Sequence, residues 1–293
     1  MAIVKNPLFS GGDPFLLYFE GTYYMYFTGG ASRERPGFVV YSSKDLQNWE
    51  NRGYCLEAKD VMGDKGFWAP ELIYHNNKFY MVYVANEHLG VAVSDSPLGP
   101  FVQEEKKWLS EKNAIDGHFL IDEDGNKYLY YVRFDNGNVI YAAKMSDDLL
   151  SIDEENEVRL IEAKEEWETR DCLVAEGPFV LKHKGLYYLT YSCNHTRSQD
   201  YAVGYAVSDK PLGPFTKYEG NPILSKTDTV FGVGHHSFAM SGDGKTLLCA
   251  YHSHLSKEVA FPRNVCIDTA EFIETESGID ILTINGPSEQ INN

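Results

Sequence analysis

Five short segments place residues capable of acid–base chemistry at the start of an apolar run. They are Gly12-Asp13-Pro14-Phe15, Trp68-Ala69-Pro70-Glu71, Asp116-Gly117-His118-Phe119, Glu176-Gly177-Pro178-Phe179 and His235-His236-Ser237-Phe238. Three of the segments carry a carboxyl group at or next to their first residue, namely Asp13, Asp116 and Glu176. Carboxyl groups in different environments can divide the roles of proton donor and proton acceptor between them. The pattern therefore indicates a catalytic site, provided that the fold brings the segments together.

Each carboxylate also has an ordinary structural interpretation when it is taken alone. Aspartate before proline, as at Asp13, and aspartate before glycine, as at Asp116, both form turns. Glu176, which precedes Gly-Pro, fits a solvated loop equally well. Three acids gathered in one partly dry pocket, however, cost free energy unless they have a function. Their shared position in a fivefold repeat therefore favours the catalytic interpretation.

The segments recur because the chain repeats one hairpin five times. In the clearest copy, residues 173–191, a polar turn with Gly185 joins an apolar run to a tyrosine-rich run, as in a β-hairpin. The second runs of the five copies can be anchored at Tyr24, Tyr80, Tyr128, Tyr188 and Leu247, roughly 56, 48, 60 and 59 residues apart. A third run follows the first four anchors, and two of its closing corners, at 94–101 and 208–215, are nearly identical.

This repeat predicts an all-β fold, a five-bladed β-propeller with four-stranded antiparallel blades, forming a single catalytic domain over residues 1–293. A linear solenoid of hairpins is the rival architecture, but it usually has shorter repeats and needs capped ends. In a propeller the first strand of every blade lines the central axis. The prediction therefore places three carboxylates, Trp68 and His235 around one funnel.

The composition bounds the class of protein. The chain has 293 residues, 43% of them hydrophobic, and no apolar stretch of the length that a membrane helix needs. Its N-terminus lacks the basic and apolar regions of a secretion signal, so we expect a cytoplasmic protein, although a secreted form with its signal removed would look the same. The net charge of −17 repels phosphate backbones and argues against a nucleic-acid partner. The cysteines lie apart without a CxxC motif, which predicts buried thiols: Cys55, Cys172, Cys193, Cys249 and Cys266.

Few other elements are expected. Helical turns are predicted only at 163–170 and 104–112, and the acidic run 153–157 is interpreted as a solvated loop. The segment 279–284 is predicted to be a strand that pairs near Ile3 and Val4 and helps to close the ring.

The motifs together resemble glycoside hydrolase family 43. The resemblance rests on Asp13-Pro14, Phe67-Trp68-Ala69-Pro70-Glu71, Ile115-Asp116-Gly117, Glu176-Gly177-Pro178 and Gly232-Val233-Gly234-His235-His236-Ser237, and it extends over nearly the whole chain. It implies a five-bladed propeller and an inverting hydrolase acting on arabinofuranosides or xylosides. Such chemistry needs one protonated acid to assist the leaving oxygen and one ionised base to activate water.

The resemblance also assigns roles to residues. It makes Asp13 the general base, Glu176 the general acid, and Asp116 the third carboxylate, which orients the acid and raises its pKa by repulsion. It implies that Arg263 reaches the sugar and that His235 lies near a calcium ion or water in the channel. No cofactor is required, and a structural calcium at His235 is a possible addition. This chain departs from the family pattern at Val233 and His236, where the family often has proline and asparagine.

Trp68 is expected to supply an apolar wall for the sugar, with packing at the blade edge as its alternative role.

Arabinose- or xylose-containing oligosaccharides are the expected partners. Because the chain stops near the end of the fifth blade, we expect an exo-acting arabinofuranosidase that releases L-arabinofuranose. A β-1,4-xylosidase and an endo-arabinanase are the alternatives within the family. A fructoside hydrolase is less consistent, since its usual Asn-Asp-Pro-Asn and Arg-Asp-Pro motifs are missing here. A carbohydrate-binding propeller without catalysis is the alternative from another class.

Overall fold

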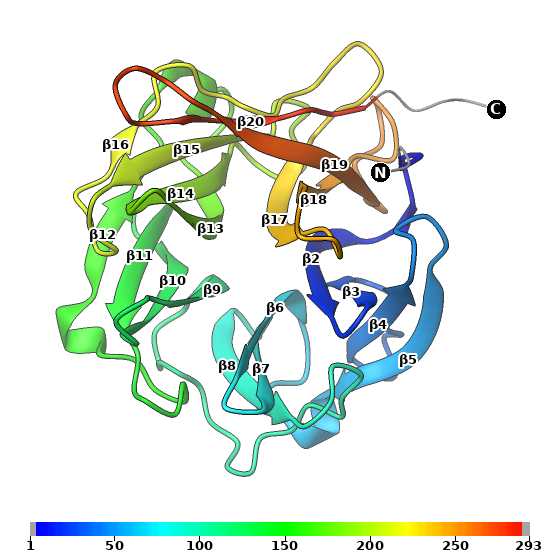
Figure 1. The fold of residues 1–293 in the computed structure, drawn as a ribbon. Helices are drawn as coiled ribbons and strands as arrows, with labels where there is room; N and C mark the ends of the chain where they lie inside the picture. The colour runs from blue at the N-terminus through cyan, green and yellow to red at the C-terminus, as the bar shows by residue number, and fades with distance from the viewer. Residues whose placement is uncertain (1–3, 289–293) are drawn as a thin grey trace.

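A computed structural model describes residues 4–288 and shows five antiparallel sheets arranged as the blades of a propeller around a central axis (Figure 1). The predicted fold class is confirmed. Blade 1 consists of β2 (Gly12–Phe19), β3 (Thr22–Thr28), β4 (Gly37–Ser43) and β5 (Glu50–Glu57); blade 2 of β6 (Trp68–His75), β7 (Lys78–Ala85) and β8 (His88–Ser94); and blade 3 of β9 (Ile115–Ile121), β10 (Lys127–Phe134), β11 (Asn138–Lys144) and β12 (Val158–Ile161). Blade 4 consists of β13 (Ala175–His183), β14 (Leu186–Cys193), β15 (Ala202–Ser208) and β16 (Thr216–Lys217), and blade 5 of β17 (Gly234–Met240), β18 (Leu247–Ser253) and β19 (Asn264–Ile273) with the short strands β1 (Phe9–Ser10) and β20 (Ile281–Ile284).

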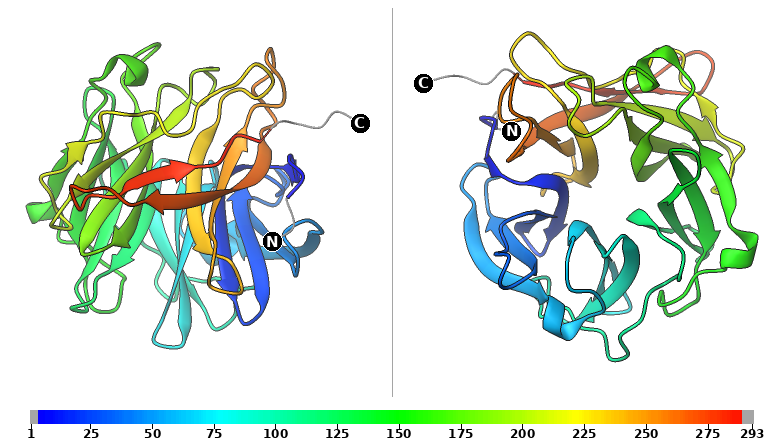
Figure 2. Two further views of the ribbon diagram at one scale, coloured as in Figure 1. Left: turned by 45° about the horizontal axis from the view of Figure 1, so that its top comes forward. Right: turned by 180° about the vertical axis from the view of Figure 1, so that it is seen from behind.

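The first strand of each blade is the innermost one. Strands β2, β6, β9, β13 and β17 face the axis in Figure 1, and the same ring is visible from behind in Figure 2. Each innermost strand also contacts its counterparts in the neighbouring blades. The five segments that the repeat singles out therefore do converge.

The ring closes through β19, although not as predicted. Strand β1 pairs with the first part of β19 and β20 pairs with its last part, so the two chain ends share one edge. The predicted partner of the C-terminal strand, Ile3-Val4, is not that partner: Val4 lies outside any strand, and Ile3 lies outside the described residues. The apolar residues of 281–284 identified the strand, but β20 turns back through the connection 274–280 and pairs with β19, the strand that precedes it.

The smaller elements differ from the prediction in three places. Only Glu166–Glu168 of the segment 163–170 is helical, as a single 3₁₀ turn, and the segment 104–112 contains no helix. The acidic run forms another 3₁₀ turn, Glu154–Asn156, and it is not simply solvated. Glu154 and Glu157 both form ion pairs with the buried Arg133, and this attraction holds the turn against blade 3. Among residues 4–288, no helix is long and apolar enough to cross a membrane.

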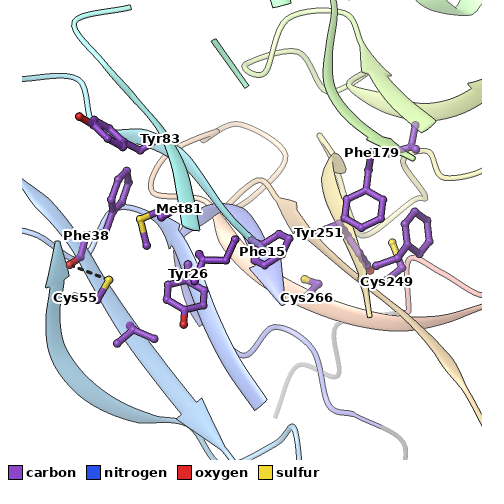
Figure 3. Close-up of a cluster of buried hydrophobic side chains, with 14 of the residues drawn as sticks. Phe15, Tyr26, Phe38, Cys55, Met81, Tyr83, Phe179, Cys249, Tyr251 and Cys266 are labelled. Atoms are coloured by element: carbon purple, nitrogen blue, oxygen red, sulfur yellow. Dashed lines mark hydrogen bonds between the residues drawn. The ribbon is translucent and has the colours of Figure 1, made fainter. Parts of the chain in front are cut away.

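The core lies between the blades and is built largely from aromatic side chains. Figure 3 shows part of it, where Phe15, Tyr26 and Tyr83 from blades 1 and 2 continue into Phe179 and Tyr251 from blades 4 and 5. Four of the five cysteines are buried and unpaired within these layers, as predicted, and Cys172 is partly buried. Burial of this much apolar surface makes the blades rigid supports for the axial residues.

Candidate active site

Every innermost strand carries the same β-bulge close to its start. In blade 1, Gly12 pairs with Thr28 and Phe15 with Tyr26, so that two residues of β2 oppose one of β3. The register shifts at the matching place in the other four blades. The first bulged residue has a positive φ in each case: Asp13 (49°), Ala69 (42°), Asp116 (55°), Gly177 (56°) and His235 (45°). The same five residues line one axial pocket. A bulge re-aims a side chain, and here it turns five equivalent residues toward the axis.

This register corrects the predicted alignment. Asp13, Asp116 and His235 do occupy one repeat position. In blades 2 and 4 that position belongs to Ala69 and Gly177, so Trp68 and Glu176 each lie one residue before it. The cause is the hairpin turn, which is longer in blades 3 and 5 than in the others. Counting back from the second strand therefore shifts the blades relative to one another. Glu176 approaches the pocket from beside the bulge.

Asp13 is buried in a strongly positive environment. Arg263 donates two hydrogen bonds to it, one from Nη2 to Oδ2 at 2.9 Å and another from Nη1 to Oδ1. The Nδ1 atoms of His235 and His252 lie 3.3 Å and 3.4 Å from its Oδ1. Burial alone would raise the pKa of Asp13, but the nearby Arg263, His235 and His252 outweigh burial and hold that pKa well below its usual value. Asp13 is consequently ionised at neutral pH.

Glu176 is held by neutral donors. The Asn138 side-chain amide donates to its Oε2 and the Tyr201 hydroxyl donates to its Oε1, both at 2.9 Å. Burial raises the pKa of Glu176 to about 7, because these two hydrogen bonds only partly offset the loss of hydration. The two carboxyl groups thus differ in the direction that an acid and a base require.

Asp116 is buried beside the backbone of Gly177. Its Oδ2 accepts a hydrogen bond from the Gly177 amide at 3.2 Å. Burial, together with the charges of Glu176 and Asp13, raises the pKa of Asp116 well above its usual value. The raised pKa of Glu176 comes first from burial. The structure supports Asp116 as a group that positions the backbone next to Glu176.

His235 lies between the two aspartates. Its Nδ1 is 3.3 Å from Asp13 and 3.9 Å from Asp116, and burial lowers its pKa. Within residues 4–288, no group of three or more His, Cys, Asp or Glu side chains is arranged to hold a metal ion. Calcium prefers six to eight oxygen ligands, and the protein groups present do not supply such a cage. The described residues therefore do not fit a calcium ion held by protein ligands.

Two residues expected to touch the substrate are placed differently from the catalytic acids. Trp68 is 39% exposed at the start of β6, and its neighbours Ala69 and Pro70, rather than its own side chain, line the pocket. Arg263 is buried and both of its terminal nitrogens bond Asp13. Contact of either residue with a sugar stays a prediction.

The sequence patterns did not point to Asn138, Tyr201 and His252. A repeat signal did exist for two of them. The second-strand residue that pairs with the start of the bulge has a third-strand partner in each blade, and Asn138, Tyr201 and Arg263 all lie two residues before that partner, in blades 3, 4 and 5. Applying the repeat to the entrance of the third strand, and not only to that of the first, would have identified this position.

The axial cavity lined by the five bulged residues is narrow, with a volume of about 20 Å³. A cavity of this size holds about one water molecule. Larger hollows lie at the outer edges of the blades, for example between β8 and the segment 94–109, but the acidic side chains that line that hollow are exposed. Asp13 and Asp116 line the axial cavity, whereas half-buried Glu176 lies next to it, one residue before the lining Gly177.

The comparisons with known proteins agree with this geometry. The family model for glycosyl hydrolases family 43 matches residues 4–276. A solved structure described as an endo-1,4-β-xylanase from Bacteroides thetaiotaomicron is 42% identical, with a TM-score of 0.90 and 97% of each chain covered. A thermostable family-43 glycoside hydrolase is 39% identical with a TM-score of 0.87, covering 99% of this chain and 98% of its own. A xylosidase/arabinosidase of Bacteroides ovatus is 27% identical over 94% of this chain and 95% of its own.

The match extends over nearly the entire chain and includes every blade that contributes to the pocket. The protein is therefore a glycoside hydrolase that belongs to family 43.

Proposed function

We propose that the protein is an inverting, exo-acting hydrolase that releases L-arabinofuranose from arabinose-containing oligosaccharides. The observation that carries this proposal is the contrast between Asp13, which is held ionised by Arg263, and Glu176, whose pKa is raised to about 7. Glycosidic bond cleavage needs one group of each kind in the same pocket.

In the proposed reaction, Glu176 donates its proton to the leaving oxygen of the glycosidic bond. Asp13 accepts a proton from a water molecule, which attacks the anomeric carbon from the opposite face. Asp116 fixes the backbone at Gly177 through its hydrogen bond. The His235 ring lies between Asp13 and Asp116 and against Gly177.

Inversion is supported by the blades from which the two groups come. Asp13 belongs to blade 1 and Glu176 to blade 4, and these blades are not neighbours in the ring (Figure 1). Inverting enzymes separate acid and base by about 6.5–9.5 Å to leave room for water, whereas retaining ones hold them about 5–5.5 Å apart. Groups that face each other across the axis favour the wider arrangement.

The choice of exo action rests on a relative from Cellvibrio japonicus named as an extracellular exo-α-(1→5)-L-arabinofuranosidase, which is 28% identical and covers 80% of this chain. The choice of arabinose rests on the relative named as a xylosidase/arabinosidase. A second candidate, hydrolysis of β-1,4-xylosides, is favoured by the name of the 42% identical structure, an endo-1,4-β-xylanase.

The test is a screen of aryl α-L-arabinofuranoside, aryl β-D-xyloside, linear arabinan and xylo-oligosaccharides, with proton NMR of the first sugar released. We expect arabinose from the ends of arabinose-containing chains, in the anomeric configuration opposite to that of the substrate. Release of xylose alone would select the second candidate, and internal cleavage of arabinan would replace exo by endo action. Retained configuration would contradict the roles of Asp13 and Glu176, and saccharide binding without turnover would indicate a binding protein.

A further inference from the structure

Tyr201 contacts the proposed acid, Glu176, and also His252, a neighbour of the proposed base, through different parts of its side chain. Its hydroxyl donates to Glu176 Oε1 at 2.9 Å. Its ring stacks on the ring of His252, with centroids 5.4 Å apart and an interplanar angle of 8°. Both side chains are fully buried, with 0% of their surface exposed. The hydroxyl of Tyr201 is therefore fixed by Glu176, and its ring is fixed by His252 of blade 5.

His252 in turn holds the backbone of the base. The Asp13 amide donates to His252 Nδ1 at 3.2 Å, and Arg263, which binds the Asp13 carboxylate, lies 3.4 Å from the same nitrogen. The Asp13 amide needs the lone pair of Nδ1 as its acceptor, so a neutral ring carries its proton on Nε2. Burial lowers the pKa of His252 to about 3, in agreement with a neutral ring.

The position of Tyr201 is also specified by a glycine. A Cβ atom added to Gly234 would lie 2.5 Å from the Tyr201 ring. Gly12 occupies the same position in blade 1, where an added Cβ would overlap the guanidinium group of Arg263. Both glycines thus leave room for a third-strand residue of the preceding blade, and the two residues that they admit hold Glu176 and Asp13.

We propose that Tyr201 is a positioning residue that sets the orientation of Glu176 and, through His252, its spacing from Asp13. The inference rests on the proposed function, since it assigns Glu176 and Asp13 to acid and base. Asn138 holds the second oxygen of Glu176, so the carboxyl group cannot rotate while both donors are in place. The charged groups around it are Asp13 from β2, Asp116 from β9 and Arg263 from the segment before β19. Tyr201 thus connects Glu176 to Asp13 through one intermediate residue, His252.

The test separates the hydroxyl from the ring. Tyr201→Phe keeps the stack and removes a donor that favours the carboxylate form of Glu176. We expect the alkaline limb of kcat/KM to move upward by about one pH unit. We also expect kcat on oligosaccharides to fall about tenfold, with little loss on aryl glycosides that have very acidic leaving groups. Tyr201→Leu removes the stack as well and is expected to reduce turnover of both substrate types.

Tyr191→Phe is the matched control. Tyr191 is another buried tyrosine of blade 4 whose hydroxyl bonds a carboxylate, Glu168, at 2.7 Å, but it lies outside the pocket. Its pH profile should be that of the wild type. An unchanged profile and unchanged leaving-group dependence in Tyr201→Phe would overturn the proposal.

Titration of the Glu176 carboxyl group by carbon-13 NMR needs no substrate. It should show a higher pKa in Tyr201→Phe than in the wild type. If the wild type cleaves no tested glycoside, the proposed function fails, and the titration still decides whether Tyr201 controls Glu176. If the wild type is active but the two titrations coincide, only the inference about Tyr201 fails.

Discussion

The two carboxyl groups differ because their hydrogen-bond donors differ in charge. Asp13 receives a bidentate guanidinium, and charge-assisted pairs of this kind are roughly twice as strong as neutral hydrogen bonds. Glu176 receives an amide and a phenol, which stabilise its ionised form less than burial destabilises it. The identity of two or three neighbouring side chains therefore decides which carboxyl group keeps its proton.

This contrast predicts how activity depends on pH and on the leaving group. The acid works only when protonated, so hydrolysis of natural oligosaccharides should decline as the pH rises through about 7. The base works only when ionised, and its depressed pKa should keep activity high to well below neutral pH. Glu176→Ala should reduce cleavage of oligosaccharides by about 10²–10⁴-fold, while aryl glycosides with very acidic leaving groups are largely spared.

Initial rates on both substrate types between pH 4 and pH 9 (roughly the range in which such groups titrate) check this prediction. Asp13→Ala serves as the contrasting variant, because loss of the base should reduce both reactions. Equal losses on both substrates in Glu176→Ala would remove Glu176 from the acid role.

The strained bulges are supported by side chains of the preceding blade. Thr28, Ser192 and His252 occupy one repeat position on the second strands, opposite the start of the bulge. Each accepts the backbone amide of a bulged residue in the next blade, namely Ala69, His235 and Asp13. At Gly177 the carboxylate of Asp116 performs this function. Side chains of one blade thus position the bulge of the next blade, and with it the residues of the active site.

A second set of hydrogen bonds between neighbouring blades involves the residue just after each bulge. Side chains of the residue just after the bulge accept the amide of the next blade's innermost strand: Glu71 from Phe119, His118 from Val180, and Ser237 from Leu16. Glu71 is a fourth buried carboxyl group near the axis, and its hydrogen bond explains it without a catalytic role.

The repeat in the sequence was sufficient to predict the fold and the position of Asp13, Asp116 and His235, because these depend on hairpin periodicity. It misaligned Trp68 and Glu176, since turn lengths vary between blades while the bulge does not. Tyr201 and His252 could not be found from the first strands alone. Their function depends on contacts between blades 4, 5 and 1, and no local pattern encodes such contacts.

A prediction at the scale of the strand concerns Ser192. Its buried hydroxyl accepts the His235 amide at 2.8 Å, and Ser192→Ala would leave that amide without its partner. We expect the free energy of unfolding to fall by about 1–3 kcal/mol. Urea denaturation provides the measurement. Ser253→Ala is the control, because Ser253 is equally buried in β18 but its hydroxyl has only a 3.6 Å contact with the sulfur of Cys266. A decrease in the free energy of unfolding no larger than that of the control would show that the bulge does not depend on this hydrogen bond.

At the scale of the whole molecule, the ring is closed by two chain ends that share one edge of β19. Strand β1 pairs up to Val265 and β20 begins to pair at Ala270. The hairpin that leads into β20 also reaches blade 4, where Asp280 pairs with His183 at 2.7 Å and with Lys184 at 2.9 Å (Figure 1). Closure thus involves blades 4, 5 and 1, which also supply Glu176, Tyr201, His252 and Asp13.

Between β1 and β20, the side chain of Asn6 pairs with the edge of β19 in place of a strand. The Asn6 amide accepts a hydrogen bond from the Ile267 N–H at 2.9 Å and donates one to its carbonyl at 3.0 Å, as a backbone peptide group would. Asn6→Ala leaves both groups buried and unpaired, and each such loss costs about 1–3 kcal/mol. Because closure joins the first blade to the last, we expect a clear drop in the melting temperature. Turnover per folded molecule well below that temperature should be preserved.

Differential scanning calorimetry measures the melting temperature, and assays at low temperature measure the turnover. Asn285→Ala is the control, since Asn285 bonds β19 from an exposed position. A melting temperature equal to that of the control would show that β1 and β20 close the ring without Asn6.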